Sequence, residues 1–197
     1  MEKIENLSPE NKFKILKYLG CNYYIGNIPL FNNLPKITTI EDIPLYINEI
    51  SKHGKKPTII FKSISAGSLD QKLSLFLKND FNPENKVIID SRLPQLFRVS
   101  SNNNEKFDII PLKESSGYGK YQVNTRKPGI MVFPGNWASG WKAWINNKKT
   151  QVFEANIFSK GILIPPGAHK LMLRYLPDSF LAGSWISIIS IFCLTIT

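Results

Sequence analysis

The second half of the chain alternates short apolar runs with turn residues. Seven of these runs have the length and composition of β-strands, namely 107–112, 120–125, 129–133, 141–145, 151–155, 161–164 and 169–175. In the last run Leu171, Leu173 and Tyr175 occupy every second position, which is the period of a strand with one buried face. Closely spaced strands without helices between them predict an antiparallel β-sandwich over residues 101–178.

The first half of the chain mixes helical and strand patterns. A helix is expected to begin at Ser8, which is followed by proline and an acidic residue. A second helix is expected after Ser68, because Gln71 completes a capping box with it. Four β-type runs predict strands, at 21–25, 45–47, 58–64 and 87–90. We therefore expect residues 1–100 to form a mixed α/β part that leads into the sandwich.

The C-terminal segment has a different character, because no charged residue follows Asp178. Residues 179–197 are almost entirely apolar and would span about 28 Å as a helix, close to a hydrocarbon core of roughly 30 Å. Only small hydroxyl residues interrupt the segment, and a helix can bond these to its own backbone. The segment is predicted to be a C-terminal transmembrane helix, and a buried element of a soluble core is the alternative. Arg174, Tyr175 and Trp185 would anchor it at the membrane interface.

The charge balance narrows the choice of partners. The 197 residues include 25 Lys and Arg against 15 Asp and Glu, a formal net charge of +10, and 43% are apolar, which excludes global disorder. The lysines are dispersed along the chain and no nucleic-acid-binding motif accompanies them. We therefore expect no nucleic acid as partner, and favour solvated charge or charge that faces anionic lipid headgroups.

The sequence carries no pattern typical of a metal, cofactor or catalytic site. His53 and His169 have no Cys, Asp or Glu at ligand spacing and are interpreted as surface residues. The segment 117–120 resembles a phosphate-binding loop but lacks the first glycine and the final Ser or Thr, so a hairpin turn is expected there. No catalytic residue, metal ligand or cofactor is predicted for this chain.

Three tryptophans lie within eight residues, at positions 137, 141 and 144. Aromatic side chains on a sandwich can stack on sugar rings, and they can equally anchor a core. In a strand, Trp141 shares one face with Ala143 and Trp144 shares the other with Lys142. Because Lys142 favours the solvent-exposed face, we expect Trp141 to point inward and Trp144 to lie at least partly outward. Trp137 and Trp144 remain as residues for a contact with an acceptor or with another domain.

Residues 129–183 resemble the C-terminal region of the YfhO family of bacterial membrane proteins. The segment 134–145 (PGNWASGWKAWI) is similar to the family's Pro-Gly and Gly-Trp-Lys-Ala segment that precedes a short hairpin. The segments 154–156 (EAN), 161–169 (GILIPPGAH) and 173–177 (LRYLP) match the pieces that follow it, in the same order and spacing. The insertion of Asn-Trp-Ala-Ser and the second proline at 166 depart from the pattern.

The resemblance implies a polytopic membrane protein similar to glycosyltransferases that use a polyprenyl-phosphate sugar for cell-envelope glycosylation. The chain would be an extracytoplasmic accessory domain followed by the final span, at residues 179–197, with residues 1–178 outside the bacterial cell membrane. Its partners would be the lipid bilayer, the remaining transmembrane domain, and a glycan or lipid-linked sugar. The family's acidic catalytic residues would lie outside these residues. A membrane-tethered carbohydrate-binding or adhesion sandwich without an enzyme is the alternative, and a tail-anchored cytosolic protein is a third reading.

Overall fold

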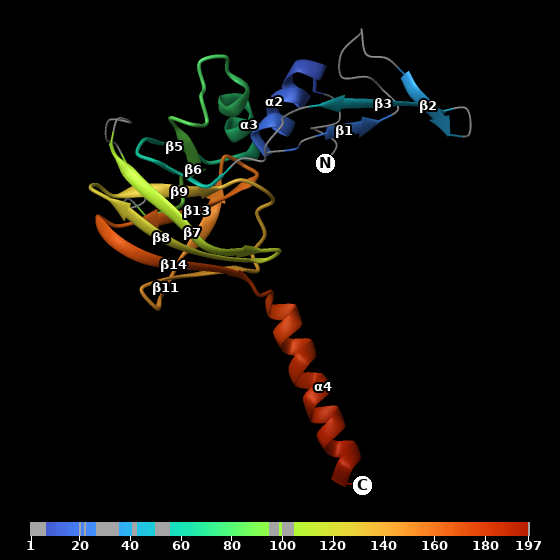
Figure 1. Cartoon of the computed structure of the whole chain (residues 1–197), viewed down its shortest axis with the longest axis vertical. Coiled ribbons are helices and arrows are strands. Elements are labelled where there is room, and N and C mark those ends of the chain that lie inside the picture. Colours follow the sequence, from blue (N-terminus) through green and yellow to red (C-terminus); the bar gives the residue numbers. More distant parts are fainter. Residues whose placement is uncertain are drawn as a thin grey trace.

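The computed structural model describes residues 7–19, 21, 23–26, 36–40, 43–49, 56–94, 99 and 105–196. Figure 1 shows two packed sheets, a small separate sheet near the N-terminus, and a C-terminal helix that points away from the sheets. The helices are α2 (Pro9–Leu19), α3 (Leu69–Leu77) and α4 (Asp178–Ile196). The fold of the described residues is therefore mostly β, with a sandwich-like packing of its two larger sheets.

The five-stranded sheet is antiparallel and comes entirely from the second half of the chain. Its order is β11-β10-β14-β8-β7. The strands are β7 (Phe107–Ser115), β8 (Tyr118–Thr125), β10 (Trp141–Ile145), β11 (Lys148–Thr150) and β14 (Gly167–Tyr175). The predicted runs that begin at 107, 120, 141 and 169 are confirmed as strands, whereas β11 was not predicted.

The six-stranded sheet combines strands from both halves of the chain, in the order β4-β9-β13-β12-β6-β5. Its strands are β4 (Thr58–Ile60), β5 (Ser63–Ala66), β6 (Val87–Asp90), β9 (Gly129–Phe133), β12 (Val152–Ala155) and β13 (Ser159–Ile164). The single strand predicted over 58–64 is wrong, because the chain breaks at residues 61–62 into β4 and β5. β5 pairs in parallel with β6, and the connection between these two strands contains α3.

The break at residues 61–62 explains the shape of this sheet. β4 and β5 form its two opposite edges although they are neighbours in sequence. Six strands spaced by about 4.8 Å would separate the edges by about 24 Å if the sheet were flat. The three residue steps from Ile60 to Ser63 reach about 10 Å. The sheet must therefore curl until its edges approach each other.

Two apolar clusters fill the space on either side of the curled sheet. Along β9, Met131 and Phe133 belong to the cluster between the two sheets, whereas Ile130 and Val132 belong to a second cluster on the other face. All five residues of β9 are buried for this reason. The strand has the continuous apolar sequence expected when both faces are covered.

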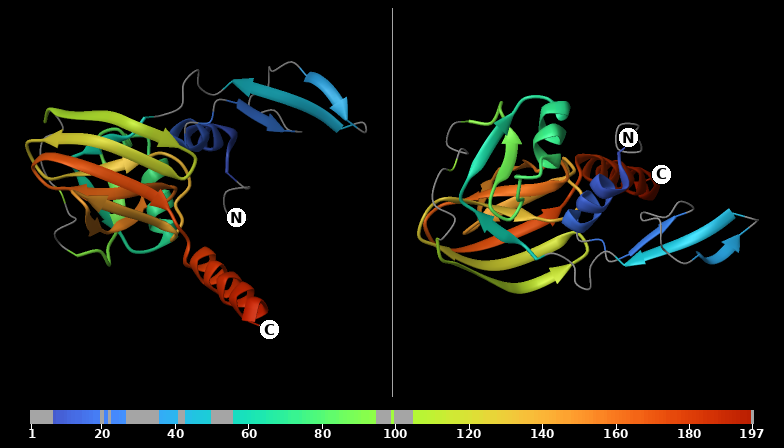
Figure 2. Two further views of the ribbon diagram at one scale, coloured as in Figure 1. Left: turned by 60° about the horizontal axis from the view of Figure 1, so that its bottom comes forward. Right: turned by 90° about the horizontal axis from the view of Figure 1, so that it is seen from above.

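Helices α2 and α3 cover the end of the sheet that carries β5 and β6, as Figure 2 shows from two directions. Ser68 and Gln71 form the predicted capping box at the start of α3. Phe76 of α3 is fully buried against Tyr18 of α2, with the ring centroids 5.1 Å apart. Buried Asn156 joins the helices to the sheet, since it donates to Tyr18 Oη at 2.9 Å and accepts from the Ile88 amide at 2.7 Å.

A separate three-stranded antiparallel sheet lies next to α2. It consists of β1 (Tyr23–Gly26), β2 (Lys36–Ile40) and β3 (Ile43–Glu49), in the order β1-β3-β2. The strands predicted at 21–25 and 45–47 correspond to β1 and β3, and β2 was not predicted. Figure 1 shows this sheet extending away from the sandwich.

Helix α4 continues directly from β14 and stands away from the rest of the molecule (Figure 1). The predicted helix is confirmed, but the predicted membrane span is not found. None of the helices within the described residues combines the length and the apolarity that crossing a membrane requires. Large side chains of α4 that include Trp185, Ile186 and Ile189 are more than half exposed.

Candidate functional site

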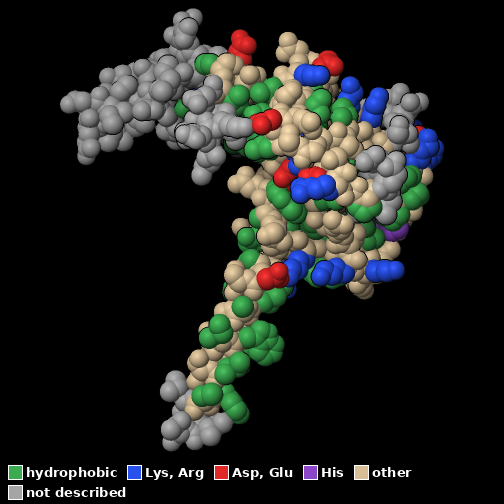
Figure 3. Space-filling model, turned by 180° about the vertical axis from the view of Figure 1, so that it is seen from behind, with side chains coloured by type: hydrophobic (Ala, Val, Ile, Leu, Met, Phe, Trp, Pro, Cys, Tyr) green, Lys and Arg blue, Asp and Glu red, His purple; other side chains and the backbone are tan. Residues whose placement is uncertain are grey.

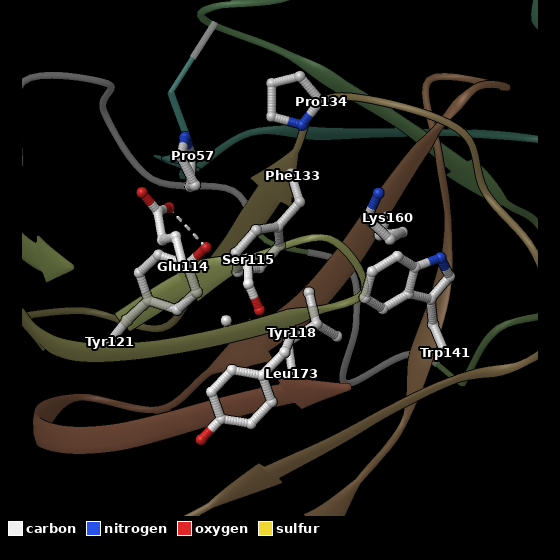
Figure 4. Close-up of a pocket in the computed structure, with 11 residues that line it drawn as sticks. Pro57, Glu114, Ser115, Tyr118, Tyr121, Phe133, Pro134, Trp141, Lys160 and Leu173 are labelled. Carbon is white, nitrogen blue, oxygen red and sulfur yellow. Dashed lines mark hydrogen bonds between the residues drawn. The ribbon is translucent and has the colours of Figure 1, made fainter. Parts of the chain in front are cut away.

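A pocket of about 220 Å³ lies between the two sheets, at the end of the sandwich from which α4 departs. We call it the Lys160 pocket, and Figure 4 shows its residues. Its lining comes from both sheets and comprises Pro57, Glu114, Ser115, Tyr118, Gly119, Tyr121, Phe133, Pro134, Trp141, Lys160 and Leu173. Phe133 and Leu173 belong to the core between the sheets, so the pocket ends on apolar side chains.

Lys160 supplies the positive charge of the pocket. It lies on β13 beside Phe133 of β9, and the residue is only 6% exposed. Its Nζ lies 4.6 Å from the centre of the Trp141 ring, which is cation–π geometry. No described residue forms a hydrogen bond or ion pair with this ammonium. Burial lowers the pKa of the Lys160 ammonium from its ordinary value of 10.5.

A tyrosine and a carboxylate occupy the opposite side of the pocket (Figure 4). Tyr121 Oη donates a hydrogen bond of 2.8 Å to Glu114 Oε1. Burial, and then the bond to the Glu114 carboxylate, raises the pKa of the Tyr121 phenol. Gly119 makes room for this tyrosine, since a Cβ at that position would lie 2.6 Å from the ring. The pocket therefore has a cation on one side and an anionic acceptor on the other.

The pocket lies next to the base of α4. The Trp141 ring packs on Tyr175 with the centroids 5.3 Å apart. The Tyr175 amide donates to the Gly117 carbonyl at 2.7 Å, and the Leu176 amide donates to the Gly140 carbonyl at 2.7 Å. These contacts attach the last residues before α4 to the two turns that border the pocket. The direction of α4 and the shape of the pocket are therefore fixed by the same residues.

A second, shallower hollow of about 310 Å³ contains Trp137, together with Asp90, Arg92, Gln151 and Glu154. Lys72 of α3 contacts two of these side chains, with its Nζ 3.1 Å from Asp90 and 2.8 Å from Glu154. Arg92 hydrogen bonds to Asp90, and this contact together with Lys72 holds the pKa of the Asp90 carboxyl well below its ordinary value. Each charge in this network has an opposite partner, so the network holds α3 to the sheet.

The predicted contact and anchor residues lie at four separate places. Trp137 lies in the shallow hollow, and half-buried Trp144 lies on the outer face of the five-stranded sheet, opposite Lys149 and Met172. Arg174 and Tyr175 are exposed at the end of β14, and Trp185 is exposed on α4. Their roles as acceptor contacts or membrane anchors stay predictions.

The other residues interpreted from the sequence are Trp141 and the two histidines. Trp141 packs against the core between the sheets, so its predicted inward direction is confirmed, although the side chain is half-buried rather than buried. His169 is half-buried on β14, with its ring nitrogens 3.0 Å from Asn146 Nδ2 and 3.1 Å from the Pro166 carbonyl. His53 lies outside the described residues. Within the described ranges no group of three or more His, Cys, Asp or Glu side chains is arranged to hold a metal ion.

The sequence interpretation missed Lys160, Glu114 and Tyr121. One signal was present, because Lys160 shares its strand face with Ile162 and Ile164, which are both fully buried. A lysine in the inward register of an apolar strand indicates either a buried ion pair or a binding group. Glu114 gave no such signal, since it lies in a strand whose residues are mostly exposed.

Comparison with protein-family models, with curated proteins and with solved structures finds no match to this chain.

Proposed function

We propose that this chain is a membrane-attached accessory domain that holds a sugar-containing ligand close to a lipid surface. The observation that carries the proposal is the position of the Lys160 pocket beside the base of an exposed apolar helix. In this proposal α4 enters the bilayer, and the sandwich lies on the extracytoplasmic side of a bacterial membrane.

The surface of α4 supports attachment to lipid. Its exposed large side chains are apolar, and they are Phe180, Trp185, Ile186, Ile188, Ile189, Ile191 and Phe192. The hydroxyls of Ser184, Ser187 and Ser190 each donate to the carbonyl four residues earlier, at 2.8 to 3.0 Å. The hydroxyl groups are therefore satisfied within the helix, as a lipid environment requires. In water such an exposed apolar surface is unfavourable, which indicates a partner.

The outer face of the five-stranded sheet adds a second attraction to lipid. Lys142 lies opposite Arg174, and Trp144 lies opposite Lys149. Lys120 and Lys170 are exposed on the same face. Figure 3 shows Lys and Arg side chains along the lower edge of the domain, beside the base of α4. The basic sheet face, as we call it, consists of Lys120, Lys142, Lys149, Lys170 and Arg174. Its charge favours anionic headgroups, and each cation near such a surface contributes about 1 kcal/mol.

Vesicle flotation of the full chain tests the attachment. We expect the chain to float with vesicles of phosphatidylcholine and phosphatidylglycerol, and to lose this with the double substitution Ile186→Asp and Ile189→Asp. Leu69→Asp is the matched control, because Leu69 is an exposed apolar residue on α3. A wild-type chain that stays at the bottom of the gradient with every vesicle would show that α4 does not attach to lipid.

Within this proposal the chain serves a YfhO-like glycosyltransferase that uses a polyprenyl-phosphate sugar, as the sequence resemblance implies. The alternative is a tethered carbohydrate-binding or adhesion module, which the pocket alone would satisfy. Purification of the chain from detergent-solubilised membranes separates the two. Co-purification with transferase activity on a polyprenyl-phosphate sugar supports the first function, and glycan binding without such activity supports the alternative.

A further inference from the structure

Lys160 is a buried residue whose charge has no counter-charge among the described residues. The same domain contains a direct comparison, because buried Lys72 has two carboxylates within 3.1 Å. The carboxylate opposite Lys160 on the neighbouring strand is that of Glu154, and Glu154 binds Lys72 instead. The Lys160 side chain is buried up to an ammonium that faces the pocket. Partial desolvation of this charge without a counter-charge lowers stability, and a methionine of similar length would avoid the cost. Lys160 is thus placed where an anion from outside would complete its surroundings.

Trp141 and Gly135 lie beside the Lys160 ammonium. The Trp141 ring lies on one side of Nζ, at 4.6 Å from the ring centre. Position 135 is a glycine with φ of 103°, and a Cβ there would come within 3.6 Å of Nζ. The positive φ favours glycine at this position, and Lys160 itself lines the pocket, so a ligand in the pocket can reach the ammonium.

The opposite side of the pocket favours a ligand with hydroxyl groups. The Glu114 carboxylate accepts one hydrogen bond from Tyr121 and has further acceptor positions. Ser115 also lines this part, between Glu114 and Trp141 in Figure 4. The volume of about 220 Å³ is below the roughly 300–1,000 Å³ of pockets for drug-sized ligands, so a single ring suits it.

We propose that the Lys160 pocket binds a monosaccharide unit that carries an oxyanion, a carboxylate or a phosphate, with the oxyanion on the Lys160 ammonium. The sugar hydroxyls donate to Glu114, and an apolar face of the ring contacts Phe133 or Trp141 at the end of the pocket. The inference rests on the proposed sugar-binding function and specifies its ligand class. The unit can be free or the head of a lipid-linked sugar, because the pocket lies beside the base of α4.

Binding measurements on the full chain test this inference. The probes are glucose, glucuronate, glucose 1-phosphate and inorganic phosphate, and their binding is measured by calorimetry or by intrinsic tryptophan fluorescence. We expect glucuronate or glucose 1-phosphate to bind at least 10-fold more tightly than glucose. Lys160→Met should remove this difference, whereas Lys148→Met, which removes an exposed charge on β11, should leave it unchanged.

The outcomes separate the inference from the function on which it rests. Equal affinity for glucose and for both charged sugars would overturn the oxyanion assignment and leave sugar binding in place. Inorganic phosphate that binds as tightly as glucose 1-phosphate would overturn the sugar part and leave Lys160 as an anion site. Oxyanion preference that persists in a folded Lys160→Met chain would place the site elsewhere. Comparison of glucose 1-phosphate in solution with a lipid-linked sugar phosphate in vesicles then identifies the source of the ligand.

Discussion

Two lysines of this domain are buried, and their surroundings shift the pKa values of the two ammonium groups in opposite directions. Burial alone would lower the pKa of Lys72, but hydrogen bonds to Glu154 and Asp90 outweigh it and raise that pKa. For Lys160 burial acts alone, and the pKa is lowered. The charge of Lys72 therefore stabilises the fold through its partners, whereas the charge of Lys160 opposes folding.

The first prediction concerns the stability of Lys160→Met. Methionine keeps the length of the side chain and removes the unpaired charge, so we expect the free energy of unfolding at pH 7 to rise by about 1 kcal/mol. The unfolded chain binds more protons than the folded chain between the lowered pKa of Lys160 and 10.5. Wild-type stability therefore rises with pH in this window, and the advantage of the variant shrinks there.

Urea unfolding at a series of pH values checks this prediction. Lys148→Met serves as control, because Lys148 is exposed and its removal should change stability little at any pH. A loss of stability in Lys160→Met that is the same at pH 7 and pH 10 would mean that the lysine has a structural partner. Higher stability combined with weaker oxyanion binding would identify Lys160 as a residue kept for function.

At the scale of elements, local patterns predicted most strands and long-range pairing decided the rest. The strands 129–133, 141–145 and 87–90 have the boundaries expected from their apolar runs, because each is bounded by turn residues. The sequence could not show that residues 61–62 break a strand, since the break depends on which distant strands pair with β4 and β5. The pocket was unpredictable for the same reason, because Lys160 and Glu114 come to line one pocket only when the two sheets pack.

The second prediction concerns the hairpin between β10 and β11. Asn146 and Asn147 have φ values of 49° and 67°, so both central residues of this two-residue turn are left-handed. Asn146 also joins the hairpin to β14, because its Oδ1 accepts from the Lys170 amide at 2.8 Å. Its Nδ2 lies 3.0 Å from His169 Nδ1. Asn146→Ala should therefore lower the free energy of unfolding by about 1–2 kcal/mol, since each lost hydrogen bond contributes about 1 kcal/mol.

Asn147→Gly is the matched substitution in the same turn. Glycine adopts a positive φ without steric cost, so we expect this variant to be as stable as the wild type or slightly more stable. Thermal or urea unfolding of both variants decides the matter. An Asn146→Ala variant that is as stable as Asn147→Gly would contradict the stabilising role assigned to the bonds from Asn146 to β14.

At the scale of the whole molecule, the sandwich packs around its own core, whereas helix α4 makes few contacts with it. Beyond the junction, the ion pair between Lys142 Nζ and Asp178 Oδ1 at 2.5 Å joins the start of α4 to the sheet. Gly183 has no neighbour within 4 Å of its Cβ position, and the large apolar residues of α4 are exposed. Attachment and folding should therefore be separable properties.

The third prediction follows from this division. A chain that ends at Asp178 keeps the Lys142 contact and loses only the exposed part of α4, so its thermal midpoint should lie within about 2 °C of the full chain, where 1 kcal/mol corresponds to roughly 2–4 °C. The same truncation should abolish flotation with vesicles while glucuronate or glucose 1-phosphate still binds in solution. The residues that line the Lys160 pocket all lie between Pro57 and Leu173, so the truncated chain retains them. A midpoint lower by 10 °C or more would mean that α4 packs on the sandwich in solution, and its exposed apolar face would then belong to the fold and not to a lipid surface.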